Sequence, residues 1–169
     1  MKVVLEVPED LDVQFVYRMI RKQQFETEMP RGFKFFYLNS PSDALPHKSA
    51  CIAAWGLPAY LKILAKLASK SRSLYIVLHD ESLASFGWCN LGFCKHYRLE
   101  PDALMIGPIE TFSQFQSRGL GSIAMMQAIN LNLHKSISIF YIDTQRTNIP
   151  AQKAFLKCGF GEPFALYLR

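Results

Sequence analysis

The sequence QSRGLGS at residues 116–122 decides how the whole chain is interpreted. It follows an apolar run at 103–112 that predicts a strand, and it opens an apolar pattern at 119–134 that predicts a helix. Gly119 and Gly121 allow the backbone to approach a ligand without Cβ clashes. Because the first turn of a helix leaves N–H groups unpaired and carries partial positive charge, we expect main-chain groups here to hold a pyrophosphate. The Arg118 guanidinium can add a charge-assisted hydrogen bond.

Two common nucleotide-binding motifs do not fit this segment. The P-loop pattern GxxxxGK[ST] is absent from the sequence. Gly119-x-Gly121-x-x-Ala124 matches the loose dinucleotide fingerprint, and Asp143 lies near the spacing of a ribose-binding acid. However, six polar or turn-like positions separate the expected strand from Gly119, and only 26 residues follow Asp143. That is too little chain for the remaining βαβ units, so we set the dinucleotide fold aside.

The apolar periodicity along the rest of the chain alternates between strand and helix patterns. In order, it predicts a strand at 2–7, a helix at 11–24, an irregular segment with one short strand (33–38) at 29–50, a helix that begins near Pro58, a β-hairpin at 74–91, a strand at 103–112, a helix at 119–134, a strand at 137–143, a helix at 149–158 and a strand at 164–168. There is no internal repeat, low-complexity tract or linker. We therefore expect a single mixed α/β domain over residues 1–169.

The composition is that of a globular protein, with 50% hydrophobic and 20% charged residues. No apolar stretch approaches the roughly 18–20 residues that a membrane span needs. The first ten residues lack the plan of a signal peptide, so a cytoplasmic location is the expectation. The four cysteines form no CxxC pair and no zinc-type spacing with histidine, so we expect reduced thiols and no metal site.

The net charge of +5 suits an anionic ligand. Nucleic acid is a second class of anionic partner, but the basic residues are spread along the chain without a long block. The sequence also has no zinc-finger, RNP or basic-zipper signature. We therefore expect a small anionic ligand and no nucleic-acid partner.

Two motifs resemble those of the GNAT superfamily of acyl-CoA N-acyltransferases. Gln116-x-x-Gly119-x-Gly121 resembles the signature [Q/R]-x-x-G-x-[G/A] of that family. Residues 143–160, DTQRTNIPAQKAFLKCGF, resemble its following motif, with the spacing N-x-x-A-x-x-x-aromatic from Asn148 to Phe155 and a terminal Gly-Phe. The element order from residue 74 to the C-terminus agrees. The resemblance implies a GNAT fold, in which a central, mostly antiparallel, twisted sheet splays at the CoA site and is flanked by helices.

The resemblance also implies acetyl-CoA as cosubstrate and assigns residues to it. These residues are Gln116, Ser117, Arg118, Gly119, Leu120, Gly121 and Ser122 for the pyrophosphate, Thr111 and Asn148 for the pantetheine arm, and Phe155 near the thioester sulfur. An extended pantetheine chain can add to a splayed strand much as a peptide does. The last position of the second motif is often a tyrosine that acts as general acid, and here it is Phe155. That departure leaves the proton donor open, with Tyr141 and Tyr167 as alternatives, and leaves room for a CoA-binding protein without turnover.

Acetyl transfer to an amine also needs a base or a water chain that removes the ammonium proton. Glu110 is the first candidate, because it is an acid in an otherwise apolar run at the carboxyl end of the strand beside the expected thioester. Apolar surroundings disfavour a charged carboxylate and make it a stronger base. The alternative, of equal weight, is that Glu110 faces solvent at the strand end. Lesser candidates for the base are His79, Glu81 and His96, for each of which a position at the surface or in a loop is the favoured interpretation.

The acceptor is predicted from short resemblances. Residues 144–152 and 165–169 resemble the subgroup that acetylates nucleotide-linked amino sugars, such as the dTDP-fucosamine acetyltransferases. Gly87-Trp88 and the Gly107-Pro108 strand resemble transferases of bacterial surface-glycan pathways. Two alternatives stay open: an N-acetyltransferase of amino acids, polyamines or protein N-termini, with Glu26 and Glu28 at its acceptor site, and a non-catalytic CoA-binding regulatory module. The expected partner is a small-molecule amine, and a homodimer is left open.

Overall fold

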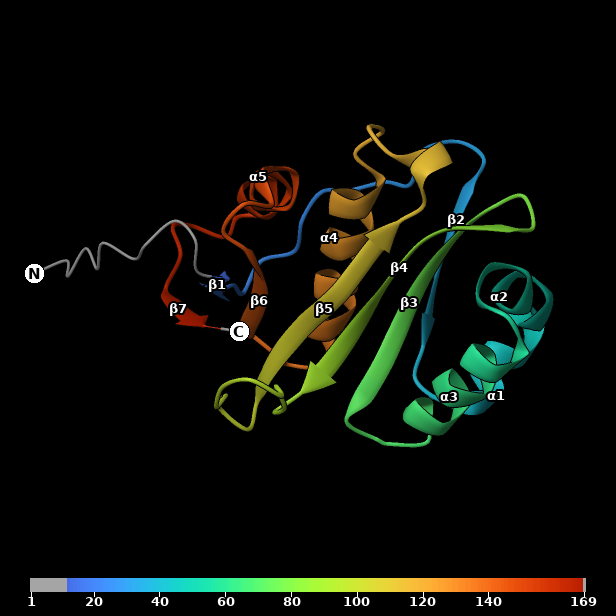
Figure 1. The fold of residues 1–169 in the computed structure, drawn as a ribbon, viewed down its shortest axis with the longest axis horizontal. Coiled ribbons are helices and arrows are strands. Elements are labelled where there is room, and N and C mark those ends of the chain that lie inside the picture. The colour runs from blue at the N-terminus through green and yellow to red at the C-terminus, as the bar shows by residue number, and fades with distance from the viewer. Residues whose placement is uncertain (1–11, 169) are drawn as a thin grey trace, which may run out of the picture.

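The computed structural model describes residues 12–168. Seven strands form one sheet in the order β2-β3-β4-β5-β6-β1-β7 (Figure 1). The strands are β1 Val13–Ile20, β2 Phe33–Leu38, β3 Arg72–His79, β4 Ser82–Leu91, β5 Ala103–Thr111, β6 Ile139–Gln145 and β7 Ala165–Leu168. All neighbouring strands are antiparallel except β5 and β6, which are parallel. The expected mixed α/β fold with a mostly antiparallel sheet is confirmed.

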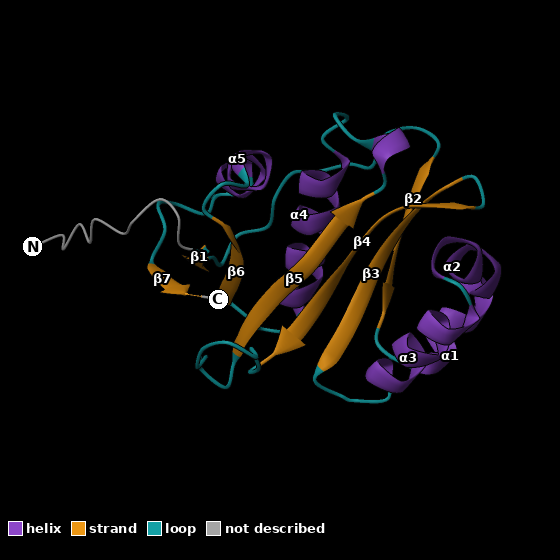
Figure 2. Ribbon diagram, in the orientation of Figure 1, coloured by secondary structure: helices purple, strands orange, loops and turns teal. Residues whose placement is uncertain are grey.

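Helices cover both faces of the sheet (Figure 2). They are α1 Pro41–Ala44, η1 Leu45–His47, α2 Lys48–Trp55, α3 Leu57–Leu67, η2 Ser113–Phe115, α4 Leu120–His134 and α5 Ile149–Lys157. Strand β3 separates two parts of the core, because successive side chains of a strand point to opposite faces. Leu74 and Ile76 pack with α1, α2 and α3, whereas Tyr75 and Val77 pack with α4. Among residues 12–168, no helix is both long and apolar enough to cross a membrane.

The sheet opens between β5 and β6. Their parallel pairing begins at Ala103 with Ile139 and ends at Ile106 with Ile142. The next residues of β5 are Gly107, at a φ of 136°, and Pro108, whose ring nitrogen carries no N–H for a sheet hydrogen bond. The two strands separate towards their carboxyl ends, as Figure 1 shows. This gap is the splay expected of the GNAT fold.

The prediction of a helix at 11–24 is wrong, because residues 13–20 form β1 between β6 and β7. Apolar and polar residues do not alternate along β1, because this strand is buried on both faces. The spacing of its apolar residues therefore resembles that of a helix. Tyr17 and Met19 lie in the core beside α4, while Val16 lies in a smaller cluster on the other face. Antiparallel pairing with β6 from residue 14 to residue 20 overrides the local pattern. The strand expected at 2–7 lies outside the described residues.

The irregular segment expected at 29–50 contains the predicted short strand, β2, but is helical from Pro41 onward. Pro41 stands in the first turn of α1, where a missing N–H costs nothing, and the Ser40 side chain accepts a hydrogen bond from the Asp43 N–H. Pro41 and Pro46, two of the turn-forming residues that suggested an irregular segment, therefore stand at helix starts. The other predicted elements are confirmed, with boundaries that move by one or two residues.

Candidate active site

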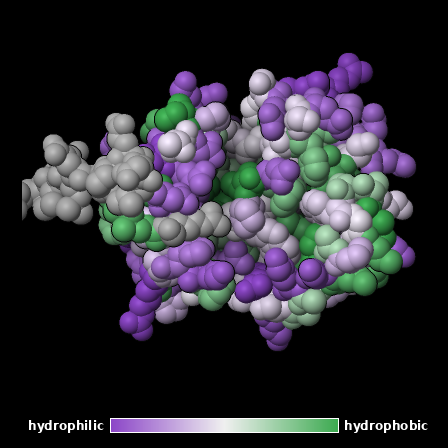
Figure 3. All heavy atoms as spheres, viewed as in Figure 1, coloured by the Kyte–Doolittle hydropathy of each residue, from purple (hydrophilic) through white to green (hydrophobic). Residues whose placement is uncertain are grey.

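The gap between β5 and β6 opens into a cavity of about 490 Å³, which we call the gap cavity. Its walls are residues 106–109 and 111 of β5, residues 142–145 of β6, and one side of α5 that includes Ala151 and Phe155. In the space-filling view of Figure 3, apolar surface shows in the opening between α5 and β5, flanked by hydrophilic side chains. An apolar chain with a few polar groups fits this lining.

A second cavity, of about 600 Å³, lies at the N-terminus of α4, and we call it the helix-end cavity. It shares Thr111, Gly121, Asn148 and Ala154 with the gap cavity, so the two form one continuous groove. The groove runs from the first turn of α4, past the start of α5, to Phe155 at the splay. An elongated ligand can therefore have its polar end at the helix and its other end between the strands.

The start of α4 has the features of an anion site. Gly119 is its N-cap residue at a φ of 71°, in the left-handed region, and no side chain within residues 12–168 caps the helix. The N–H groups of the first turn thus point into the helix-end cavity without a side-chain acceptor. A Cβ on Gly121 would lie 3.2 Å from Thr111 Oγ1, whereas a Cβ on Gly119 would meet nothing within 4 Å. The absence of a side chain at Gly121 therefore lets the start of α4 lie close to Thr111, while Gly119 supplies the left-handed backbone conformation at the N-cap.

Two lysines that sequence analysis missed line the same cavity. Lys153 and Lys157 are exposed residues four positions apart on α5, and so lie on one face of that helix. Their positive charge adds to that of the α4 N-terminus. The sequence shows two lysines after Asn148, but it does not show that they lie near the α4 N-terminus. Only the packing of α5 beside α4 places them at the same cavity. The Arg118 side chain is exposed and lines neither cavity, contrary to what its position in the motif suggested.

Other residues that the resemblance assigns to CoA also lie along the groove. The Gln116 side chain donates a hydrogen bond of 2.9 Å to the Thr111 carbonyl, which holds the turn against the end of β5. Asn148 is the N-cap of α5 and lines the groove, and its Oδ1 accepts a hydrogen bond from the Ala151 N–H at 3.3 Å. Phe155 is only 5% exposed, and its ring meets the Tyr17 ring edge at 5.3 Å between centroids.

Glu110 does not lie in the apolar surroundings that the sequence suggested. Its side chain is exposed, it pairs with Phe86 across β4 and β5, and it lines neither cavity. The alternation along β5 explains this position, because Ile109 and Thr111 take the inward places on either side of it. The expectation of an apolar neighbourhood is thus corrected, and the alternative of a solvent-facing strand end describes Glu110.

A third cavity, of about 430 Å³, lies on the other side of the gap, and we call it the loop-side groove. Met105 lines this groove and Ile106 lines the gap cavity, so the two open on opposite faces of β5. Gly107, Pro108 and Asp143 line both. The gap between β5 and β6 is therefore the place where ligands from the two faces can meet.

Asp143 is the only carboxylate among the described residues that line the three cavities. Its Oδ2 accepts hydrogen bonds from the hydroxyls of Tyr97 and Tyr167, each at 3.2 Å. Burial, followed by the negative charge of Asp143, raises the pKa of Tyr97 well above its ordinary value, so this phenol stays protonated. Sequence analysis assigned Asp143 no catalytic role, because nothing local shows that Tyr97 of the β4–β5 loop packs beside it.

The other titratable candidates are separated. His79 lies 3.5 Å from Asp80 at the β3–β4 turn, and neither His79 nor Glu81 lines any of the three cavities. Glu26 and Glu28 are exposed and also lie outside them. His96 lies in the loop-side groove, where its ring stacks on Tyr167 at 5.3 Å. Among residues 12–168, no three His, Cys, Asp or Glu side chains are grouped as metal ligands would be.

The profile of the acetyltransferase (GNAT) family matches residues 35–160. The chain belongs to this family. The match begins in β2 and ends just after α5, so it includes the α4 N-terminus, the gap between β5 and β6, and both motifs. No curated protein is significantly similar to the chain in sequence.

Solved structures of the GNAT fold resemble the chain at low sequence identity. A tandem GNAT protein from the clavulanic acid biosynthesis pathway is 13% identical at a TM-score of 0.67, over 95% of this chain and 53% of that one. A GNAT-family acetyltransferase from Colwellia psychrerythraea is 16% identical at a TM-score of 0.62, over 93% and 54%. The aminoglycoside N-acetyltransferase AAC(6')-Iy in complex with CoA is 18% identical at a TM-score of 0.59, over 82% and 95%. The chain thus spans about half the length of the first two.

Proposed function

We propose that this GNAT-family chain transfers the acetyl group of acetyl-CoA to a primary amine. The observation that carries the proposal is the continuous groove from the uncapped N-terminus of α4 to the gap between β5 and β6, with a carboxylate at the gap. Residues 1–169 are proposed to act as one acetyltransferase domain in the cytoplasm. No other described cavity combines unpaired helix N–H groups, cationic side chains and an apolar channel.

Acetyl-CoA is proposed to lie along this groove. The N–H groups of residues 119–122 bind the pyrophosphate, with Lys153 and Lys157 as charged neighbours. The pantetheine arm lies between β5 and α5, where the main chain of β5 beyond Ile106 has lost its β6 partner and is open to a new one. Thr111 and Asn148 flank this arm, and Phe155 packs beside the thioester.

The amine is proposed to reach the thioester from the loop-side groove. Its nitrogen lone pair attacks the acetyl carbon, the C–S bond breaks, and the thiolate takes up one proton while the amine loses one. Holding both reactants at the gap supplies part of the rate acceleration. The proton acceptor is one of two carboxylates: Glu110, which the strand position suggests, or Asp143, which lines both sides of the gap. Tyr97 and Tyr167, whose hydroxyls donate hydrogen bonds to Asp143, are the proposed proton donors.

A nucleotide-linked amino sugar is the proposed acceptor. The resemblance of residues 144–152 and 165–169 to amino-sugar acetyltransferases supports it. The fold similarity to an aminoglycoside N-acetyltransferase is in line with an amino-sugar acceptor but does not choose among amino sugars. The rival acceptors are amino acids, polyamines and protein N-termini.

An assay of thiol release from acetyl-CoA tests the proposal. The protein is incubated with dTDP- and UDP-linked amino sugars, free amino sugars, spermidine, amino acids and a peptide with a free N-terminus. We expect thiol release and a product heavier by one acetyl group with at least one amine, and the highest kcat/KM with a nucleotide-linked amino sugar. CoA binding without transfer to any amine would refute catalysis and support the regulatory module. Transfer to spermidine or the peptide alone would refute the amino-sugar acceptor.

A further inference from the structure

The loop-side groove carries an excess of positive charge. Lys66 of α3, Arg72 of β3 and Lys95 of the β4–β5 loop line it, against the single carboxylate of Asp143. Within residues 12–168, none of these three cations lies within ion-pair distance of a carboxylate. Clustered cations without ion-pair partners repel one another, and an anion bound between them removes that repulsion.

Aromatic rings, and not acids, position two of the three cations. Lys66 Nζ lies 5.2 Å from the centroid of the Trp88 ring, and Arg72 Cζ lies 5.3 Å from that of Phe93. Cation–π contacts of this kind hold a side chain in place without neutralising its charge. Both cations thus keep their full charge for a ligand in the groove.

The third cation is presented by a loop that is anchored at two points. The Tyr97 hydroxyl donates to Asp143, and the Arg18 guanidinium of β1 pairs with Glu100 at 3.0 Å. Between these anchors and the end of β4, Lys95 and His96 face the groove. The loop therefore has a fixed attachment to the sheet beside the gap.

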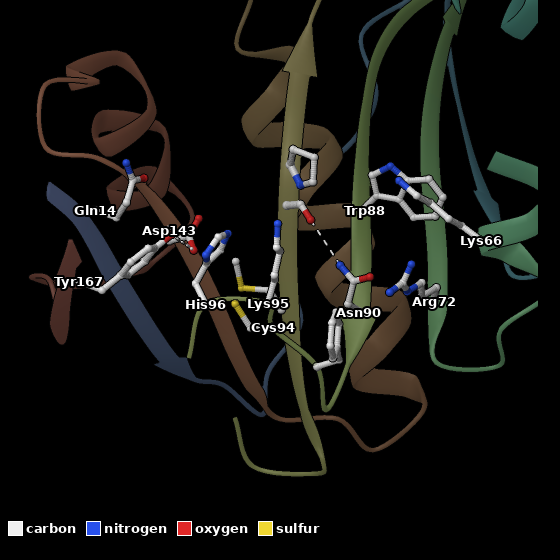
Figure 4. A pocket seen from close by; sticks show the side chains of 14 residues that line it. Gln14, Lys66, Arg72, Trp88, Asn90, Cys94, Lys95, His96, Asp143 and Tyr167 are labelled. Atoms are coloured by element: carbon white, nitrogen blue, oxygen red, sulfur yellow. Dashed lines mark hydrogen bonds between the residues drawn. The ribbon is translucent and has the colours of Figure 1, made fainter. Parts of the chain in front are cut away.

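The two ends of the groove differ in charge, as Figure 4 shows. Lys66 and Arg72 lie beside Trp88 and Asn90 at one end, and Asp143 lies with Tyr167 and His96 at the other. Lys95 lies between the two groups in this view. A single molecule with a cationic amine at one end and an anionic group at the other matches this order of charges.

We propose that the loop-side groove is an anion-binding subsite of the acceptor, in which Lys66, Arg72 and Lys95 bind a phosphate ester or diphosphate while the amine lies at Asp143. The inference rests on the proposed acetyl transfer and deepens it, because it defines the acceptor as a phosphorylated amine. Phosphate oxygens accept charge-assisted hydrogen bonds from lysine and bidentate ones from arginine. The same cations repel a polyamine, which therefore makes a poor acceptor.

CoA is another source of phosphate, and the structure separates it from the acceptor. Its proposed pyrophosphate site, with Lys153 and Lys157, lies in the helix-end cavity and shares no lining residue with the loop-side groove. An effect of the three cations on CoA alone would therefore contradict the proposal.

A binding experiment tests the subsite independently of catalysis. The protein is saturated with CoA and titrated calorimetrically with dTDP and with inorganic pyrophosphate. Lys66→Gln/Lys95→Gln removes two charges from the groove, and both side chains are exposed, so the fold should survive. Lys62→Gln/Arg98→Gln removes the same charge from α3 and the same loop at exposed positions that line none of the three cavities. We expect the groove variant to bind both probes about tenfold more weakly or worse, since each charged hydrogen bond is worth a factor of about ten.

The control variant should bind both probes as the wild-type protein does. Equal weakening in the two variants would reduce the effect to net charge and overturn the subsite. Absence of binding to the wild-type protein, or weakening of CoA binding alone, would overturn it too.

A kinetic arm separates this inference from the proposed function. Glucosamine and glucosamine 6-phosphate are compared as acceptors, because they differ only in the phosphate. We expect a lower KM for the phosphate ester and a rise of about tenfold or more in that KM in the groove variant, with the KM of acetyl-CoA unchanged. Equal KM values for the two acceptors would overturn the subsite while leaving acetyl transfer intact. Failure to acetylate any amine would refute the proposed function, and the calorimetric result would still decide whether the groove binds phosphate.

Discussion

At the scale of single residues, Asp143 is the candidate base that the geometry of the cavities favours. It lines cavities on both sides of the sheet, and two tyrosine hydroxyls hold its Oδ2. These hydrogen bonds hold the carboxylate at the gap, where the groove-bound amine and the thioester are proposed to meet. Glu110 is the first candidate from the sequence, because it is an acid near the carboxyl end of β5. In the structure its side chain is exposed to solvent.

Replacement of Asp143 with asparagine should lower kcat/KM by about 10²–10⁴-fold, which is the usual contribution of a general base. A base acts only when deprotonated, so the wild-type rate should fall at low pH, and this acidic limb should disappear in Asp143→Asn. Glu110→Gln is the matched variant on β5, and we expect a smaller loss there. A profile of kcat/KM against pH for both variants checks the assignment. The reverse order of losses would make Glu110 the base, as the sequence suggested.

In the proposed binding mode, Gly121 determines how closely CoA can approach the main chain of α4. A valine there places its Cβ 3.2 Å from Thr111 Oγ1, with two further methyl groups in the groove, so we expect Gly121→Val to fold and to lose CoA binding. Calorimetric titration with CoA measures this. Gly161→Val is the control, because a Cβ there meets nothing within 4 Å and the position has no positive φ. Normal CoA affinity in a folded Gly121→Val protein would contradict the proposed binding mode.

The four cysteines should differ sharply in reactivity towards alkylating reagents. Burial raises the pKa of Cys51 to about 11 and those of Cys89 and Cys158 to about 12, so at pH 8 these thiols are protonated as well as inaccessible. Cys94 is partly exposed in the loop-side groove. We expect iodoacetamide to modify Cys94 first, as measured by peptide mass spectrometry. Cys94→Ser should then remove the fast-reacting thiol, and early modification of Cys158 would show that the core opens more readily than the structure indicates.

At the residue scale, the sequence predicts the groups that act through local conformation. The proposed roles of Gly119, Gly121 and Asn148 depend on turns and helix starts within a few residues, and the structure places all three on the groove. The residues that sequence analysis missed, Tyr97 and Lys153, depend on distant chain segments packing together. No local pattern carries that information.

At the scale of elements, β1 shows where periodicity fails. Apolar residues at Phe15, Val16, Met19 and Ile20 fit a helical spacing, yet the segment is a strand. A strand that is buried on both faces does not need to alternate apolar and polar residues. Its pattern of apolar residues therefore cannot be distinguished from that of a buried helix. The elements from β3 onward are predicted well because hairpin turns, paired glycines and capping residues mark their ends.

Because β1 is an interior strand, substitutions within it should be costly. Tyr17 is 2% exposed and packs against Phe155, so we expect Tyr17→Ala to lower the free energy of unfolding by about 3–5 kcal/mol. Denaturant-induced unfolding measures the change. Ile20→Ala in the same strand removes a side chain that is 59% exposed and should cost about 0.5 kcal/mol or less. Equal effects of the two substitutions would mean that β1 is not held in the sheet as described.

At the scale of the whole molecule, the two proposed ligand sites lie on opposite faces of one sheet. The gap cavity and the loop-side groove share Gly107, Pro108 and Asp143 at the gap, together with Gln14 of β1. With the sites so placed, neither ligand has to leave before the other binds, and we expect acetyl transfer to occur directly within a ternary complex. The proposed reaction therefore uses both sides of the sheet.

Steady-state kinetics tests this arrangement. Initial rates measured over a grid of acetyl-CoA and acceptor concentrations should give intersecting double-reciprocal lines, because both substrates must be bound before product leaves. The intact mass of the protein, incubated with acetyl-CoA alone, should stay unchanged. Parallel lines together with an acetylated protein would indicate a covalent intermediate and would contradict direct transfer.

The position of β1 between β6 and β7 has a consequence for biosynthesis. Gln14 leaves the ribosome about 130 residues before its partner Gln145, which at 5–20 residues per second is a wait of ~7–26 s. The antiparallel run from β2 to β5 can pair as it is translated, while the apolar strand VQFVYRMI waits with both edges open. Such a segment is a target for chaperones and a hazard for aggregation. The nascent chain is therefore most prone to aggregation at β1, because its partners β6 and β7 are translated last. The side of the gap that β6 forms is completed only near the end of translation.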